Sequence, residues 1–530
     1  MLAPRTKRAF PPVVKTLSVP APFGVNLVDT ASDLPAGDCL VCENMLRGQY
    51  GLRTRSGYRE WVTNIGEEIR TILPFQGATG ATDKLFACTQ SGIWDVTASS
   101  AAPSQVYVFP TADADSGYGV GKGFVNLAGG HYLLYADQAN GYIVYDGSTW
   151  TKIAAGVGPT DISGVDPATF VHVGLWKNRA WFTQEDTSVA WYTGTAALYG
   201  TVTAFDFGPQ FRHGGNLVGI WNLSIDGGFG IDDYLVAMSS SGDLVIYEGT
   251  DPDVPGFFSQ VGAWYVGQVP AGNRWMTDFG GDILVLSTLG VIPVSRIKSG
   301  AITQTEDAYA SRKISPALSE QLTSLATTRG WEIRIHPEDK TLVVVVPDDD
   351  TQWLMSLHAN SWSKSTGVPM ATCAEWKGKM YFGSADGTVY INDGDVDGLN
   401  RTGTNTPTAI QWSLLTAFSD IGTASNKRVK QIRPRFITDG AVPQYTVQAN
   451  YDFDQTLPTS ISYVTPTGAG LWDSAIWNSS TWGSGVGTAG EWRGAAGMGT
   501  YAAIAMTGAS KSRTTLTTFE VFYDVGGLAL

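Results

Sequence analysis

A hairpin pattern recurs seven times in the middle of this 530-residue sequence. Each copy is a short apolar run, a polar turn usually containing Gly, Asn or Asp, and a second apolar run. This order is typical of two β-strands joined by a tight turn. The copies are KLFACTQSGIWDV from Lys84, HYLLYADQANGYIVYDG from His131, RAWFTQEDTSVAWY from Arg179, DYLVAMSSSGDLVIYEG from Asp233, DILVLSTLGVIPV from Asp282, TLVVVVPDDDTQWLMS from Thr341 and KMYFGSADGTVYIND from Lys379.

The spacing of these hairpins predicts a β-propeller. Successive copies begin 38 to 59 residues apart, about 49 on average, and a propeller blade holds about four strands in roughly 40–50 residues. The alternative is a pair of β-sandwiches, but sandwich strands recur every 8–12 residues or so without a longer period. We therefore predict an all-β chain with a propeller over residues 71–400, and the repeat fits six or seven blades.

The widest interval between hairpins contains a segment with a different period. Apolar residues recur at helical spacing from Ile314 to Leu325. Ser315 and Pro316 suit the N-cap and the first helical position. We predict one short helix in an insertion at residues 306–328.

Two segments lie outside the repeat. Residues 1–70 are a Pro-rich basic tail followed by lead-in strands, and residues 405–530 predict a separate β-sandwich-like domain. The latter includes a Gly/Ser-rich stretch that carries Trp472, Trp477 and Trp482. Two interpretations are open. The Trp side chains form an aromatic surface that binds a partner or a glycan, or they belong to a loop and cover the sandwich or a subunit interface.

The composition excludes several classes of protein. Aromatic residues make up 11% and charged residues only 16% of the chain, whereas disordered chains are poor in aromatics and rich in charge. No apolar run approaches the roughly 18 residues of a membrane span, and the N-terminus lacks the apolar core of a secretory signal. We expect a soluble protein made in a cytoplasm, without a membrane segment.

No motif predicts a catalytic centre or a cofactor site. The sequence lacks a G-x-S-x-G elbow, and the Gly-rich run at 117–123 lacks the residues and the following helix of a phosphate loop. The five histidines form no metal-binding pattern, and Cys39 and Cys42 have no second Cys pair to complete a zinc site. We therefore expect no catalytic residues and no cofactor.

One weak candidate for a Ca²⁺ site remains. Asp393, Asp395 and Asp397 are followed by Gly398 and so imitate the start of a calcium-binding loop. The Glu expected at the twelfth position is replaced by Thr404. An Asp/Gly turn that leaves the last blade is the simpler interpretation.

Basic residues cluster twice in this acidic chain, whose formal net charge is −14. Arg5, Lys7 and Arg8 lie in the N-terminal segment, and the first acidic residue of the chain is Asp29. A second cluster lies at 427–435 and includes Lys427, Arg428 and Lys430. Both clusters are candidate partner-binding sites, and the acidic balance favours a neighbouring subunit over DNA as the partner.

Three blocks of sequence resemble a known family. Residues 213–267 contain the pattern S-x-G-x-[LV]-x-[IV]-Y-x-G-T-D-P from Ser240 to Pro252. Residues 272–295 are similar as well. Residues 24–58 carry a "G-x-N" start, an "LP" turn, and an Asn ahead of Gly-Leu-Arg. These blocks resemble the tail nozzle or tail-hub proteins, also called packaged-DNA stabilisation proteins, of short-tailed bacteriophages.

The resemblance implies a structural protein of the virion tail. Such a propeller subunit would assemble with copies of itself as a ring, expected to be a hexamer, below the portal and the tail adaptor protein. It would lie near tail fibre, spike or needle proteins. The ring retains packaged DNA and conducts it during ejection without sequence-specific binding, so no enzyme activity is expected. The alternative is a glycan-binding or glycan-cleaving propeller, a receptor-binding tail component with the Trp-rich stretch as its platform.

Overall fold

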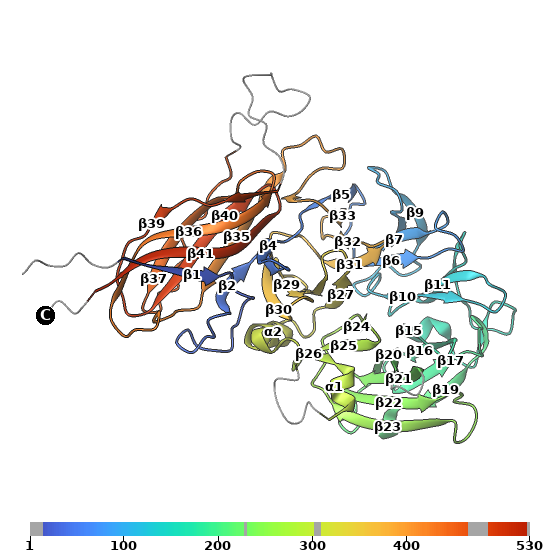
Figure 1. Cartoon of the computed structure of the whole chain (residues 1–530). Helices are drawn as coiled ribbons and strands as arrows, with labels where there is room; N and C mark the ends of the chain where they lie inside the picture. The colour runs from blue at the N-terminus through green and yellow to red at the C-terminus, as the bar shows by residue number, and fades with distance from the viewer. Residues whose placement is uncertain (1–13, 227–230, 301–308, 465–485, 527–530) are drawn as a thin grey trace, which may run out of the picture.

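The computed structural model describes residues 14–226, 231–300, 309–464 and 486–526. It confirms the predicted fold class, because a β-propeller and a β-sandwich fill the two sides of the molecule (Figure 1). Each of the seven sequence hairpins forms the second and third strands of a group of strands around the propeller ring.

Six blades are sheets of their own. The first blade contains β6 (Thr71–Phe75), β7 (Lys84–Cys88), β8 (Gly92–Asp95) and β9 (Ser104–Val108), and the second contains β10 (Val120–Val125), β11 (His131–Asp137), β12 (Gly141–Tyr145) and β13 (Trp150–Lys152). The third contains β15 (Phe170–Trp176), β16 (Arg179–Gln184), β17 (Val189–Tyr192) and β19 (Thr203–Asp206), and the fourth contains β20 (Leu217–Asp226), β21 (Ile231–Ser239), β22 (Asp243–Gly249) and β23 (Phe258–Tyr265). The fifth contains β24 (Met276–Phe279), β25 (Asp282–Ser287) and β26 (Gly290–Pro293). The sixth contains β31 (Thr372–Trp376), β32 (Lys379–Gly383), β33 (Val389–Asn392) and β5 (Tyr58–Val62).

A seventh blade completes the ring and also leaves it. Its strands are β27 (Glu332–His336), β28 (Thr341–Val345), β29 (Thr351–Ser356) and β30 (Ser361–Thr366). They pair in this order, and β30 then pairs with β2 (Cys39–Glu43) of the sandwich, so that one nine-stranded sheet runs through both parts of the molecule. The first strands of neighbouring blades contact one another around the axis.

The propeller is closed by a strand from far away in the sequence. β5 precedes the first blade in the chain, yet it pairs antiparallel with β33 of the last blade, with Tyr58 opposite Asn392. Val62 of β5 packs in the apolar cluster between these two blades, together with Ile72 of β6 and Ile391 of β33. Similar apolar clusters fill the spaces between other neighbouring blades.

The sandwich combines C-terminal and N-terminal strands. One sheet contains β3 (Met45–Arg47), β4 (Leu52–Thr54), β41 (Thr514–Val525), β36 (Lys427–Asp439) and β38 (Val486–Ala489), with β1 (Val14–Pro20) on β41 and β39 (Arg493–Gly494) on β36. The facing sheet continues from β2 to β35 (Thr408–Thr416), β40 (Ala502–Ser510) and β37 (Gln444–Tyr451), with β34 (Val396–Asp397) on β35. The lead-in strands therefore belong to both parts of the molecule, rather than forming a layer of their own.

The predicted helix is present inside the expected insertion. α2 (Ser315–Ser324) buries Leu318 and Leu322, and Pro316 lies in its first turn. Ser315 is the first helical residue and not the N-cap, because a 3₁₀ turn at Arg312–Ile314 leads directly into the helix. A single-turn helix, α1 (Val294–Lys298), follows β26 and was not predicted.

Small elements complete the described structure. They are a two-stranded sheet of β14 (Ile162–Ser163) and β18 (Gly200–Thr201), and 3₁₀ turns at Pro167–Thr169 and Gly208–Gln210. In the described ranges, no helix is long and apolar enough to cross a membrane.

Candidate functional site

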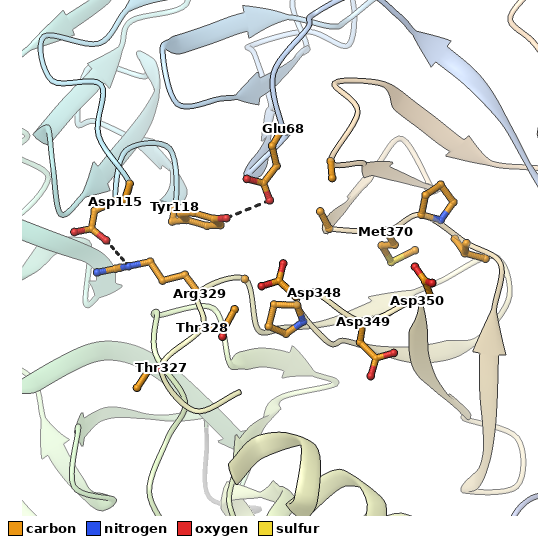
Figure 2. A pocket seen from close by; sticks show the side chains of 17 residues that line it. Glu68, Asp115, Tyr118, Thr327, Thr328, Arg329, Asp348, Asp349, Asp350 and Met370 are labelled. Carbon is orange, nitrogen blue, oxygen red and sulfur yellow. Dashed lines mark hydrogen bonds and ion pairs between the residues drawn. The ribbon is translucent and has the colours of Figure 1, made fainter. Parts of the chain in front are cut away.

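A pocket of about 480 Å³ opens at one end of the propeller axis (Figure 2). It is built by the loops that enter the first strands of four blades and by the turn between β28 and β29. We call it the axial pocket. Its lining includes Glu68, Asp115, Tyr118, Arg329, Pro347, Asp348, Asp349, Asp350, Val368 and Met370.

Three of the five carboxylates of the axial pocket are already engaged. Asp115 forms an ion pair with Arg329 at 2.6 Å. Glu68 accepts a hydrogen bond from the Tyr118 hydroxyl at 3.2 Å. Asp349 accepts the backbone N–H of Thr351 and the side-chain amide of Gln321, both at 2.8 Å. These contacts hold the loops of the pocket in place.

The remaining two carboxylates belong to Asp348 and Asp350, which are exposed. Neither forms an ion pair with any residue in the described part of the chain. Figure 2 shows the side chain of Asp350 next to that of Met370, and the side chain of Asp348 nearer to Arg329. The pocket therefore presents unpaired negative charge next to apolar surface.

Tyr118 lines the axial pocket beside Glu68. The Arg70 guanidinium lies 4.9 Å from its ring centroid, which is within the range of a cation–π contact. Burial raises the pKa of Tyr118 to about 12, and the neighbouring Glu68 carboxylate adds to the shift. Tyr118 is thus neutral near pH 7 and acts as a hydrogen-bond donor.

A buried ion-pair network lies between the blades near Tyr118. Arg274 donates to the hydroxyls of Thr71 at 3.1 Å and Thr372 at 2.9 Å, and it pairs with Glu332 at 3.3 Å. Arg334 contacts the same carboxylate at 2.8 Å. Since Arg274 leads into β24 and Thr71 belongs to β6, which are not in neighbouring blades, this side chain crosses the propeller axis.

The electrostatics of the network keep Glu332 charged. Burial alone would raise its pKa, but Arg274 and Arg334, with hydrogen bonds from Thr372 and the backbone of Cys373, lower the pKa below its usual range. Separating the blades would leave these buried charges without partners, which is costly. The network therefore holds together the blades that carry Arg274, Glu332 and Thr372. The propeller axis is occupied by protein at this level.

A second pocket, of about 400 Å³, lies among the first strands of the blades that begin with β10, β15, β20 and β24. Lys122 and Asp278 line it, together with Leu175, Ile220 and Trp221. Burial, and then the positive charge of Arg334, lower the pKa of Lys122, while Asp278 opposes the shift.

The three Asp residues of the suggested Ca²⁺ loop each face a different cation. Asp397 forms two hydrogen bonds with Arg55, at 2.6 and 2.8 Å. Asp393 lies 3.3 Å from Lys379 and 3.5 Å from Arg59, and Asp395 lies 3.7 Å from Arg513. Within the described residues, no group of three or more His, Cys, Asp or Glu side chains has an arrangement that could hold a metal ion.

The basic cluster on β36 is largely neutralised inside the sandwich. Lys427 is buried, and its ammonium donates to backbone carbonyls, including that of Thr500 at 2.6 Å. Lys430 pairs with Asp524. Only Arg428 of the three predicted residues is exposed and forms no ion pair with a described residue. The structure therefore presents little free positive charge at this candidate site.

The other predicted partner-binding residues fall outside the described ranges. These are Arg5, Lys7, Arg8, Trp472, Trp477 and Trp482. Trp492, which follows the Trp-rich stretch, is described: its ring stacks on Phe522 with centroids 4.2 Å apart, and the Arg433 guanidinium lies 4.5 Å from the ring. This indole packs on the sandwich. Cys39 and Cys42 are buried and form no disulfide.

Sequence reasoning missed the Arg274 network and the axial pocket. Alternating charges within the strand segment Trp331–His336 were the available signal for Glu332 and Arg334. No local pattern indicates that Arg274 reaches across the axis. The pocket is formed by loops from distant parts of the sequence, such as those that carry Glu68 and Met370.

Comparisons with known proteins assign no family to the chain. No protein-family model matches it, and no curated protein matches it. One similar solved structure is the extracellular domain of a putative one component system from B. thetaiotaomicron, with a TM-score of 0.36 and 9% identity over 71% of this chain. The chain spans 43% of the length of that structure. Another is the computationally designed Ika8 protein, with a TM-score of 0.33 and 11% identity, covering 63% of this chain and 99% of that one.

Proposed function

We propose that this chain is a structural protein of a phage virion, a subunit of a ring-shaped tail nozzle that retains packaged DNA and conducts it during ejection. The ring would consist of copies of this chain, six if it follows the resembled family. It would sit below the tail adaptor protein and near fibre, spike or needle proteins. This function requires no catalytic step and no cofactor.

One observation carries the proposal: the blocks that resemble tail nozzle proteins lie on the framework of the molecule. Residues 213–267 contain β20 to β23, and residues 272–295 contain β24 to β26. Residues 24–58 contain β2 to β4 and reach the start of β5. The similar residues thus build two successive blades and the segment that ties the propeller to the sandwich.

A motif within the first block supports a structural interpretation. Asp251 and Asp253, which follow the Y-x-G-T pattern, each lie 3.0 Å from the guanidinium of Arg179 in the preceding blade. Asp253 also accepts the hydroxyl of Tyr192 at 2.6 Å. These residues connect two blades and leave no carboxylate pair free for catalysis at this position.

The way the lobes are joined suits a subunit under mechanical load. One sheet runs from β27 through β2 to β37, so that it belongs to both the propeller and the sandwich. Force applied to one lobe would pass to the other through main-chain hydrogen bonds. A closed propeller also leaves only short edges for unwanted pairing.

In the proposed ring, the DNA path lies between copies of the chain. The Arg274 network crosses the propeller axis, so the axis of a single propeller is not the conduit. A ring of subunits with a net charge of −14 each would repel DNA phosphates and let the genome slide.

The deciding experiment is electron microscopy of the purified chain and of the native particle, classified without imposed symmetry. We expect a six-fold ring with an axial channel wide enough for duplex DNA, located in the tail. Single propellers in every class of both samples would contradict the proposal. So would a saccharide affinity that is lost in Trp477→Ala and Trp482→Ala, because that result supports the glycan-binding alternative.

A further inference from the structure

We propose that the axial pocket receives the basic N-terminal segment of a second copy of this chain, with Arg5, Lys7 and Arg8 as the cations that it recognises. This inference deepens the proposed ring and rests on that function only in assuming that copies of the chain associate. Three features support it: the shape and charge of the pocket, the charge of the segment and the position of the strand that follows the segment.

The pocket has the two surfaces that a long basic side chain needs. Val368, Met370 and Pro347 contribute apolar surface to its lining, and the exposed Asp348 and Asp350 contribute carboxylates. Lys and Arg bury their aliphatic stems on apolar surface while their charged heads bind carboxylates. The volume of about 480 Å³ lies within the roughly 300–1,000 Å³ usual for ligand pockets.

The charge of the pocket calls for a cation from outside its own lining. Glu68, Asp115, Asp348, Asp349 and Asp350 line it, and Arg329 is the one basic residue among the described lining residues. Glu68 also pairs with Arg70, which lies outside the lining, at 3.3 Å. Arg329 is engaged by Asp115 and also donates to the side chain of Gln138. Asp348 and Asp350 thus remain for a ligand.

The N-terminal segment is the matching surface within this chain. Arg5, Lys7, Arg8 and Lys15 all precede Asp29, which is the first acidic residue of the sequence. The other predicted basic cluster, on β36, is mostly engaged with acidic side chains of β41 and with backbone carbonyls. An Arg or Lys that reaches either carboxylate forms charge-assisted hydrogen bonds, which are stronger than neutral ones.

The position of β1 points to another copy as the source. β1 begins at Val14 and pairs with β41 in the sandwich, on the side of the molecule away from the propeller (Figure 1). The axial pocket lies at the propeller axis. Arg5 lies nine residues before Val14, and nine fully extended residues reach about 30 Å, which suffices to cross a subunit boundary.

The test is direct binding of the segment in solution. A fluorescent peptide of residues 1–13 is titrated into the full-length chain whose own tail carries Arg5→Gln, Lys7→Gln and Arg8→Gln, and anisotropy is measured. We expect saturable binding of one peptide per chain, weakened at about 0.5 M salt, where charges are screened within a few ångströms. Asp348→Asn with Asp350→Asn should weaken binding roughly fivefold or more, which follows from losing two ion pairs.

The controls separate a specific pocket from general acidity. Asp439→Asn removes an exposed carboxylate at the end of β36, outside the pocket, and should leave peptide binding unchanged. Asn accepts the positive φ of +53° at Asp348 as readily as Asp does, so the double variant should keep its melting temperature. Equal binding by the double variant and the unmodified pocket, an equal loss in Asp439→Asn, or no saturable binding overturns the inference.

The outcome for the ring is independent of the outcome for the peptide. Rings seen by electron microscopy with a peptide that does not bind would overturn the tail-docking inference and leave the nozzle proposal standing. A peptide that binds, with no rings in the native particle, would overturn the nozzle proposal and leave the tail-docking inference standing.

Discussion

At the residue scale, the charge of one buried carboxylate, that of Glu332, is held by an ion-pair network. Glu332 is 1% exposed and depends on Arg274 and Arg334 for its charge. Removing one partner of a buried ion pair commonly costs about 3–5 kcal/mol, because the other charge is left uncompensated. We expect Arg274→Met to lower the free energy of unfolding by about this amount in denaturant titrations. Arg212→Met, at an exposed position, should change it by less than about 0.5 kcal/mol.

The same network predicts how the stability of the protein depends on pH. The pKa of Glu332 is lower in the folded than in the unfolded protein, so its contribution to stability is complete above the unfolded value of about 4.3. That contribution is lost as the pH falls through the pKa that Glu332 has in the folded protein. Denaturant midpoints measured from pH 7 to pH 3 should therefore fall less steeply below about pH 4.5 in Glu332→Gln than in the wild type. Identical slopes would show that other carboxylates dominate the acid response.

At the element scale, the N-terminal strands stabilise parts of the fold that are distant in sequence. Leu52 of β4 is fully buried in the core shared by the sandwich and the propeller. Leu52→Ala should cost about 2–5 kcal/mol through lost burial and the cavity left behind. Leu127→Ala, at a position that is 92% exposed, is the matched control and should be close to neutral in the same thermal and denaturant measurements. Equal stabilities of the two variants would contradict the role of β4.

Weakening a contact between two blades should loosen the structure only near that contact. Asp253→Asn weakens the pairing with Arg179 and the hydrogen bond from Tyr192. Because Asp253 is partly exposed, the global loss of stability should be small, about 1 kcal/mol or less. Hydrogen exchange should nevertheless become faster in residues 250–257, the loop between β22 and β23, than in the wild type. Unchanged exchange there would mean that the backbone alone orders this loop.

How far the fold could be predicted from the sequence differs by element. The hairpins and α2 could be predicted because alternating and helical apolar periods are local properties of the chain. The place of β5 in the last blade could not, because Tyr58 precedes the first blade in the sequence and Asn392 ends the last one. The candidate site was harder still. Asp397 lies in a metal-like sequence, but only the fold shows that Arg55 neutralises it.

At the scale of the whole molecule, a single side chain joins three parts of the structure. Asn44, between β2 and β3, donates to Thr366 at the end of β30 at 2.9 Å and to the backbone of Gln411 in β35 at 2.8 Å. Its side-chain oxygen accepts Arg55 Nε and the Thr366 backbone N–H, both at 2.9 Å. All of its hydrogen-bonding capacity is used where lead-in, propeller and sandwich meet. Its φ of +56° also suits Asn better than most residues.

We therefore expect the two lobes of the wild type to unfold as one unit, and Asn44→Ala to separate them. The substitution removes four hydrogen bonds at a buried position and places Ala in a left-handed conformation, which together should cost roughly 3 kcal/mol or more. Scanning calorimetry should show one transition for the wild type and two for Asn44→Ala, with Asn126→Ala in a surface turn as the control. A single transition of unchanged width in Asn44→Ala would show that the shared sheet couples the lobes without this side chain. Two transitions in the wild type would contradict a rigid subunit, and with it the idea that force passes from one lobe to the other through that sheet.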